Sequence, residues 1–150
     1  MASETILSGL RPAGILSHSL APFTGGRSKS HVCRHDFTTG PWAPDRKVDL
    51  VWSSEFLEHV DEKYIDNFMS AFSKATSMVV VTYATPGQGG HHHVNENTEA
   101  YWIGQFESHG FRIDNSLTAV ARSLVPSEGV EGKQFRGKGL VFTRAPELAN

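Results

Sequence analysis

Residues 48–95, VDLVWSSEFLEHVDEKYIDNFMSAFSKATSMVVVTYATPGQGGHHHVN, are the stretch that decides the fold of this chain. The stretch begins with a short apolar run at residues 48–52 and has a second one, MVVVTY, at residues 78–83. Short apolar runs of this kind are typical of buried β-strands. About 25 residues with helical periodicity separate them, the length expected of a strand–helix–strand crossover. The stretch therefore predicts two parallel strands joined by a helix.

Polar residues gather at the carboxyl ends of both predicted strands. Ser53, Ser54 and Glu55 follow the first strand, and a Gly- and His-rich segment at residues 85–95 follows the second. In open parallel sheets, ligands bind outside the carboxyl ends of the strands. We therefore expect the functional site where these two segments meet.

The rest of the chain continues the alternation of strands and helices. Short strands are predicted at residues 31–35, 111–120 and 139–143, helices at 62–75 after Asp61 and at 98–109 after Asn97 or Thr98, and a connection at 127–138. This alternation predicts an α/β domain with a mostly parallel sheet and helices on both faces. The last two strands have no predicted helix between them, so we expect an antiparallel hairpin at the sheet edge.

Composition limits the class of protein. The chain has 150 residues, enough for one core, and a formal net charge of −2. That charge gives no electrostatic basis for binding nucleic acid or an anionic membrane. Cys33 is the only cysteine, which excludes an internal disulfide and favours a reducing, cytoplasmic location. No apolar run approaches the ~18 residues of a transmembrane helix.

Residues 1–30 differ in composition from residues 31–150. They are rich in Ser, Gly and Pro, and Glu4 is their only acidic residue. Such a segment predicts a flexible N-terminal tail. Its Ser-rich, acid-poor composition also resembles an organelle transit peptide, and that alternative stays open. The folded domain is expected to span residues 31–150.

The segment VDLVWSSEFLEHV, residues 48–60, resembles the fourth-strand segment of class I S-adenosylmethionine-dependent methyltransferases. MVVVTYATPGQGGHHHVNENTEAYW, residues 78–102, resembles their fifth strand and the loop after it, and FRIDNSLT and GLVFTR resemble their sixth and seventh strands. The resemblance covers residues 32–144. It implies a partial Rossmann-like methyltransferase sheet, S-adenosylmethionine as cofactor, and methyl transfer to oxygen or nitrogen of a small-molecule or saccharide acceptor.

The resemblance also implies a set of cofactor-binding residues. Asp36 and Phe37 match the end of the third strand, where a carboxylate bonds the adenine amino group and an aromatic ring covers the base. Ser53 and Ser54 match the segment beside the methionine part of the cofactor. The loop at residues 86–95 would close the substrate side.

Carboxylates and imidazoles near the predicted strand ends allow two kinds of chemistry. His93, Glu55 and His59 are candidate bases that could take a proton from the acceptor. Glu55, Glu58 and His59 are spaced i, i+3, i+4, which would place them on one face of a helix. With His93 they would suit Mg²⁺, Mn²⁺ or another divalent ion.

This possible metal set resembles the metal site of the small-RNA terminal 2′-O-methyltransferases and the Glu-x-x-Glu-His of ubiquinone-pathway O-methyltransferases. A divalent-metal-assisted 2′-O-type methyltransferase is therefore one alternative function. The other interpretation of the motif needs no metal. In it Glu58 bonds locally and His59 packs against the sheet.

One part of the family pattern is missing from this sequence. The first strand and its GxGxG turn should lie well before Asp36, but no such motif occurs there. Gly25-Gly26 is the only pair of adjacent glycines among residues 1–35. We therefore expect an N-terminally truncated domain with impaired methyl transfer, or a non-catalytic methyltransferase-like binding module. In the family's sheet the first strand lies beside the fourth. Residues 5–20 could supply one replacement strand, but not the two strands and two helices that are missing. Strand 48–52 is thus expected to have an open edge that favours self-association.

Overall fold

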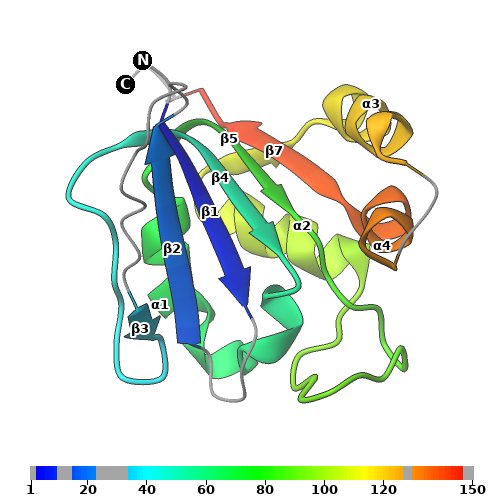
Figure 1. Cartoon of the computed structure of the whole chain (residues 1–150), viewed down its shortest axis with the longest axis horizontal. Coiled ribbons are helices and arrows are strands. Elements are labelled where there is room, and N and C mark those ends of the chain that lie inside the picture. Colours follow the sequence, from blue (N-terminus) through cyan, green and yellow to red (C-terminus); the bar gives the residue numbers. More distant parts are fainter. Residues whose placement is uncertain (1–2, 10–14, 23–33, 127–129, 147–150) are drawn as a thin grey trace.

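The computed structural model describes the backbone of residues 3–9, 15–22, 34–126 and 130–146, and the side chains of residues 35–126 and 133–146 (Figure 1). Seven strands in these residues form one sheet, in the order β3-β2-β1-β4-β5-β7-β6. Their bounds are Ser3–Gly9 (β1), Ile15–Pro22 (β2), Arg34–Asp36 (β3), Val48–Ser54 (β4), Ala75–Val81 (β5), Phe111–Ile113 (β6) and Leu140–Arg144 (β7).

Helices cover both faces of this sheet. They are α1 (Ile65–Phe72), α2 (Glu99–Ser108), α3 (Asn115–Leu124) and α4 (Val130–Lys138), with 3₁₀ turns η1 (Leu57–His59) and η2 (Glu62–Tyr64). Val79 packs in one cluster with α1 and α2, whereas its neighbour Val80 packs with Phe135 of α4 and Ala121 of α3. Successive strand residues point to opposite faces, so the two helix pairs lie on opposite sides of the sheet. Among the described helices none is long and apolar enough to span a membrane.

The centre of the sheet is parallel. β4 pairs in parallel with β1 on one side and with β5 on the other, so the carboxyl ends of these three strands share one edge. β7 pairs antiparallel with both β5 and β6. The predicted α/β fold, with a mostly parallel core and antiparallel C-terminal strands, is therefore confirmed. β6 and β7 do not form the expected hairpin, however, because α3 and α4 lie between them in the chain. The order of the first five strands is also that of dinucleotide-binding Rossmann sheets, although β2 here runs antiparallel to its neighbours.

The N-terminal strands correct one prediction. β1 pairs with β4 from Glu4↔Leu50 to Ser8↔Ser54, so the edge of β4 that we expected to be open is occupied. The physical reason is that β1 and β2 pair with each other as an antiparallel hairpin, which needs no crossover helix between them. One strand of this hairpin, β1, then pairs with β4. The flexible tail predicted for residues 1–30 therefore contains two paired strands. The domain boundary at residue 30 stays a prediction.

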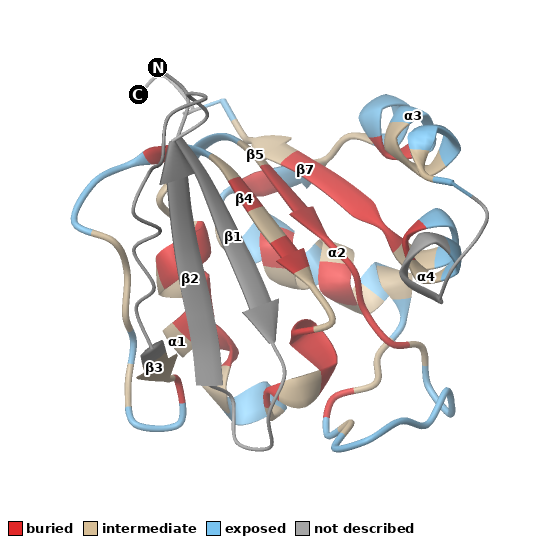
Figure 2. Ribbon diagram, in the orientation of Figure 1, coloured by how far each residue is buried: buried red, intermediate tan, exposed pale blue. Residues whose placement is uncertain are grey.

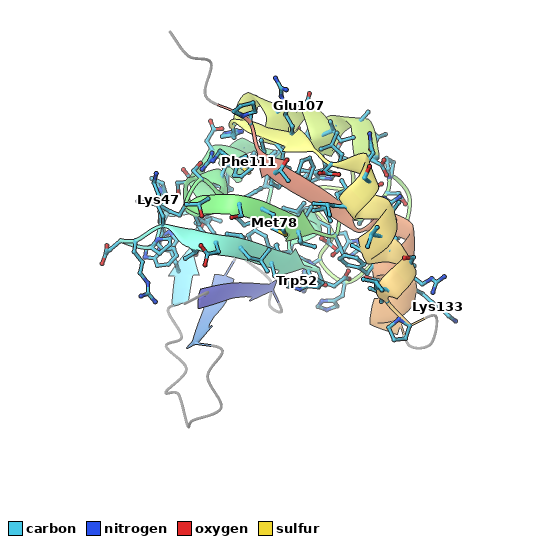
Figure 3. The ribbon with its side chains drawn as sticks, turned by 90° about the horizontal axis from the view of Figure 1, so that it is seen from above. Lys47, Trp52, Met78, Glu107, Phe111 and Lys133 are labelled. Atoms are coloured by element: carbon cyan, nitrogen blue, oxygen red, sulfur yellow. The ribbon has the colours of Figure 1, made fainter. Side chains whose placement is uncertain are left out.

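The core is concentrated on the α1/α2 face, where the buried residues cluster (Figure 2). Phe106 stacks on Phe142 with ring centroids 4.2 Å apart, and Phe72 stacks on Phe106 at 5.7 Å. Aromatic pairs of this kind contribute about 0.5–1.5 kcal/mol beyond the burial of their area. On the other face Trp52 of β4, labelled in Figure 3, stacks on Phe135 at 5.2 Å. Because Val51 belongs to the core cluster on the α1/α2 face, β4 packs on both sides.

Two local predictions differ from the structure. The strand predicted over residues 111–120 ends after three residues, because Asp114 caps α3 by accepting a hydrogen bond from Leu117 N at 2.8 Å. The connection predicted at residues 127–138 contains α4. The caps predicted at Asp61 and Thr98 are confirmed, since each side chain accepts a backbone N–H of the following turn.

Candidate functional site

The turn after β4 and the loop after β5 meet at the carboxyl edge of the sheet, as predicted, at the lower side of Figure 1. Two backbone amides of the loop, Val94 N and Asn95 N, donate to Glu58 O at 2.9 and 3.1 Å. The buried side chain of Asn95 also donates to Val60 O at 3.0 Å. These bonds fix the loop against the turn, so the site is held in place by the backbone.

Three of the four predicted metal ligands converge at this junction. One ligand atom from each of Glu58, His59 and His93 lies within 4.8 Å of the others. Tetrahedral ligands of a zinc-sized ion are about 3.4 Å apart, since each bond is about 2.1 Å long. The three ligand atoms would have to approach one another to hold one ion of this size. Glu55, the fourth predicted ligand, is not part of the converging group.

Glu58 is the most unusual member of this cluster. The residue is 1% exposed, and its Oε2 atom has no hydrogen-bond partner. Burial, with an added contribution from the negative charge of Glu55, raises the pKa of Glu58 to about 7. An unpaired buried carboxylate is costly unless a cation or a proton neutralises it. The position of Glu58 therefore fits a bound cation.

The two imidazoles are both held through Nδ1. His59 Nδ1 lies 3.1 Å from the carbonyl oxygen of His92, and His93 Nδ1 lies 2.9 Å from Glu96 Oε1. Because both partners are acceptors, each Nδ1 is the donor, and a neutral ring then keeps a lone pair on Nε2. Burial lowers the pKa of His59, which favours its neutral form. Histidines that bind a metal commonly have their other ring nitrogen held by an acceptor in this way.

The backbone around the cluster is strained and tightly packed. Glu55 and His92 have φ of 52° and 61°, a left-handed conformation that costs a non-glycine residue on the order of 1–3 kcal/mol. A Cβ placed on Gly90 would lie 2.5 Å from two atoms of the His93 ring. Strain of this kind gathers at functional sites, where the surrounding structure maintains it.

Glu55 makes contacts of its own. Its backbone amide donates to Thr82 Oγ1 at 2.9 Å, and that hydroxyl lies 3.4 Å from Glu55 Oε1. With its amide nitrogen facing the carboxylate, Gln134 of α4 donates to Glu55 Oε2 at 2.7 Å. Glu55 is thus engaged by β5 and α4, and its role as a base stays a prediction.

The predicted cofactor residues lie along the same sheet edge. Ser53 is 1% exposed with no partner for Oγ, and Ser54 is half-buried. Asp36 Oδ1 accepts from the amide and hydroxyl of Thr38 at 2.9 and 2.7 Å. Phe37 is fully buried against other aromatic rings. Its ring would have to leave the core to cover an adenine.

Sequence reasoning missed four residues at this edge: Thr82, Glu96, Gln134 and Lys138. Glu96 follows His93 at i+3 in the same loop, so its spacing was a usable signal. Gln134 and Lys138 come from α4, and Lys138 Nζ donates to Gln88 Oε1 in the loop. No local pattern indicates that α4 reaches this edge.

Comparisons with known proteins give a likeness among solved structures. No protein-family model and no curated protein matches the chain. Among solved structures, the chain is similar to magnesium protoporphyrin IX methyltransferase (ChlM) from Synechocystis PCC 6803 with bound SAH, at 16% identity and a TM-score of 0.47. The match covers 74% of this chain and 49% of that one, about half its length. At a TM-score below 0.5 this likeness does not establish a shared fold or activity.

Proposed function

We propose that this chain is a methyltransferase-type domain that binds S-adenosylmethionine and transfers its methyl group to a hydroxyl or amine of a small molecule or saccharide. One observation carries the proposal. The carboxyl ends of β1, β4 and β5 share an edge, and the segments that follow β4 and β5 are the ones that resemble class I methyltransferases. Ligands of open α/β sheets bind at such an edge.

The residues at this edge partly fit the cofactor. The unpartnered Oγ of Ser53 and the half-buried Ser54 lie at the end of β4, where a polar ligand would meet them. Asp36 lies at the same edge, because β3 is antiparallel to β2 and β2 is antiparallel to β1. These three residues would hold the cofactor, whereas Phe37 does not fit its expected contact.

The chain's contribution to methyl transfer would be orientation and proton removal. S-adenosylmethionine, when bound, supplies a methyl group activated by its sulfonium. Of the two predicted catalytic residues, His93 is the better placed base. Its Nδ1 is held by Glu96, so Nε2 is available to take the acceptor's proton. Glu55 already accepts hydrogen bonds from neighbouring side chains.

Calorimetric titration with S-adenosylhomocysteine tests this function. We expect wild-type protein to bind, and Asp36→Asn to bind more weakly because it loses the carboxylate that would accept from adenine. Asp49→Asn, an exposed carboxylate at the opposite end of β4, is the matched control and should bind like wild type. If wild-type protein shows no binding at millimolar ligand, the methyltransferase proposal is wrong and a non-catalytic module remains.

A second function, divalent-metal binding, is favoured by the convergence of Glu58, His59 and His93. With Glu55 outside the cluster, the donors are one carboxylate and two imidazoles. Mg²⁺ prefers oxygen ligands alone, whereas Mn²⁺ and Zn²⁺ accept imidazole nitrogen. We therefore propose a site for a divalent ion that accepts imidazole ligands, Zn²⁺ before the harder Mn²⁺, with an open position that could orient an acceptor hydroxyl.

Metal titration of two matched double variants tests the metal site. Glu58→Gln/His59→Ala removes two of the proposed ligands and should abolish the tightest binding event. Glu107→Gln/His109→Ala makes the same changes at the end of α2, where Glu107 is labelled in Figure 3, at residues that are not in the cluster, and should leave that event unchanged. Equal affinity in the two double variants would end the metal proposal.

A further inference from the structure

Glu96 joins two parts of the loop after β5. Its Oε1 lies 2.9 Å from His93 Nδ1, and its Oε2 accepts a hydrogen bond from Gly87 N at 2.9 Å. One carboxylate thus holds both the imidazole and the glycine-rich turn that leads up to it. No other described side chain has a hydrogen bond to the His93 ring.

The contact between these two side chains is sheltered from solvent. The side chains of His93 and Glu96 are 9% and 18% exposed. A hydrogen bond to a carboxylate at such a position is stronger than one in water, because the local dielectric constant is lower. The bond is therefore able to select one tautomer of the His93 ring and one orientation.

The packing of Gly90 limits the ring from another side. The position of a Cβ on Gly90 lies 2.5 Å from both Cε1 and Nε2 of His93 and 2.9 Å from Cδ2. The backbone of Gly90 therefore lies directly beside the His93 ring. Any residue larger than glycine at position 90 would displace that ring. Together with Glu96, this contact restricts His93 on two sides.

We propose that Glu96 is the positioning residue of the site. It keeps the proton of His93 on Nδ1, so that Nε2 is the nitrogen that keeps a lone pair, on a ring that belongs to the cluster with Glu58 and His59. This inference rests on the proposed role of His93, either as base or as metal ligand, because both roles need an unprotonated Nε2. Glu96 itself touches neither metal nor acceptor.

The tautomer of His93 in metal-free protein is the first test. Long-range ¹H–¹⁵N spectra of the imidazoles, assigned with a His93→Asn variant, should show the Nδ1–H form in wild type. In Glu96→Ala the pattern should change to a mixture with Nε2–H, and in Glu96→Gln, which keeps an acceptor oxygen, the Nδ1–H form should persist. Glu107→Ala is the charge-matched control. An unchanged His93 pattern in Glu96→Ala overturns the proposal.

Metal affinity is the second test, and it separates this inference from the metal proposal. Loss of such an outer partner weakens metal binding by about 10–100-fold. Glu96→Ala should show this loss against Zn²⁺, and Glu107→Ala should not. If wild type binds Zn²⁺ and Glu96→Ala binds it equally, the positioning role is wrong while the metal site stands. If wild type binds no metal, the metal proposal fails, and the tautomer spectra alone decide the role of Glu96.

A third variant covers the case in which Glu96→Ala does not fold. Gly90→Ala leaves the carboxylate in place but puts a methyl group against the His93 ring. We expect it to displace the ring, weaken the hydrogen bond to Glu96 and lower Zn²⁺ affinity. Wild-type tautomer and affinity in Gly90→Ala would contradict the proposed restriction of the ring.

Discussion

Glu58 places a carboxylate at a position that is 1% exposed, next to two imidazoles and the carboxylate of Glu55. Burial raises its pKa from 4.5 to about 7, so the folded protein holds this proton more tightly than the unfolded chain does. Below pH 4.5 both states are protonated, and the carboxyl group does not oppose folding. As the pH rises from 4.5 through 7, the unfolded state releases the proton first, and the free energy of unfolding falls.

Glu58→Gln tests this linkage. In metal-free protein, wild type should lose up to about 3 kcal/mol of unfolding free energy between about pH 5 and pH 8 through this one group. The variant should lack that part of the loss, because glutamine does not titrate. Urea unfolding of both proteins in the presence of EDTA measures the difference. Parallel pH profiles for wild type and variant would show that Glu58 ionises without penalty.

The predicted ligand set shows what can be read from sequence at the scale of single residues. Glu58, His59 and His93 were predicted and converge in the structure. Glu55 was predicted from its i, i+3, i+4 spacing, which assumes a continuous helix. The helical turn instead begins at Leu57, and Glu55 precedes it with φ of 52°. The spacing argument failed because Glu55 has a left-handed backbone conformation, so Glu55 and Glu58 do not lie on one continuous right-handed helix.

Helix α3 shows the same limit at the scale of an element. Residues 111–120, FRIDNSLTAV, alternate well enough to suggest a strand. Asp114 ends the strand because its carboxylate accepts a hydrogen bond from Leu117 N. An Asp before an apolar periodic run is a recognised helix start, so the signal was present. α4 has two glycines within VEGKQFRGK, and its helix depends on packing of Phe135 against Trp52, which no local pattern reveals.

Asp114→Ala tests the cap of α3. Removal of an N-cap side chain costs about 1 kcal/mol, so we expect the free energy of unfolding to fall by that amount. Asp114→Asn, which keeps an acceptor oxygen, should cost much less. Chemical unfolding of both variants, with Asp49→Ala as an exposed control, gives the comparison. A loss as large in the Asn variant as in the Ala variant would argue against a capping role.

At the scale of the whole molecule, the pairing of β1 with β4 is what the sequence left open: a replacement strand from residues 5–20 was an alternative, but an open edge was expected. The class of fold and the parallel pairing of β4 and β5 could be predicted, because apolar runs and their spacing determine them. Pairing between β1 and β4 depends on contacts more than 40 residues apart, as in Glu4↔Leu50, and local patterns carry no information on such pairs. The expected self-association through β4 followed from that omission.

Removal of residues 1–22 tests the role of β1. The shortened chain would expose the edge of β4, and an unpaired central strand is a template for association with another copy. We expect light scattering after size exclusion to show a larger, concentration-dependent mass than for the intact chain. The same variant should melt at a lower temperature. A monomeric shortened chain with an unchanged melting temperature would mean that β1 contributes little to the sheet.

The parallel pairing of β1 with β4 also has a consequence for biosynthesis. The hairpin of β1 and β2 leaves the ribosome before β4, which follows only after residues 23–47 have been made. Until then β1 is paired with β2 alone, and only the three residues of β3 extend the hairpin on its other side; so small a sheet is marginally stable in water. Loop closure over this distance is slow compared with local contacts. Within this sheet, β1 is therefore expected to be among the last strands to acquire its full set of native neighbours, although it is made before β4.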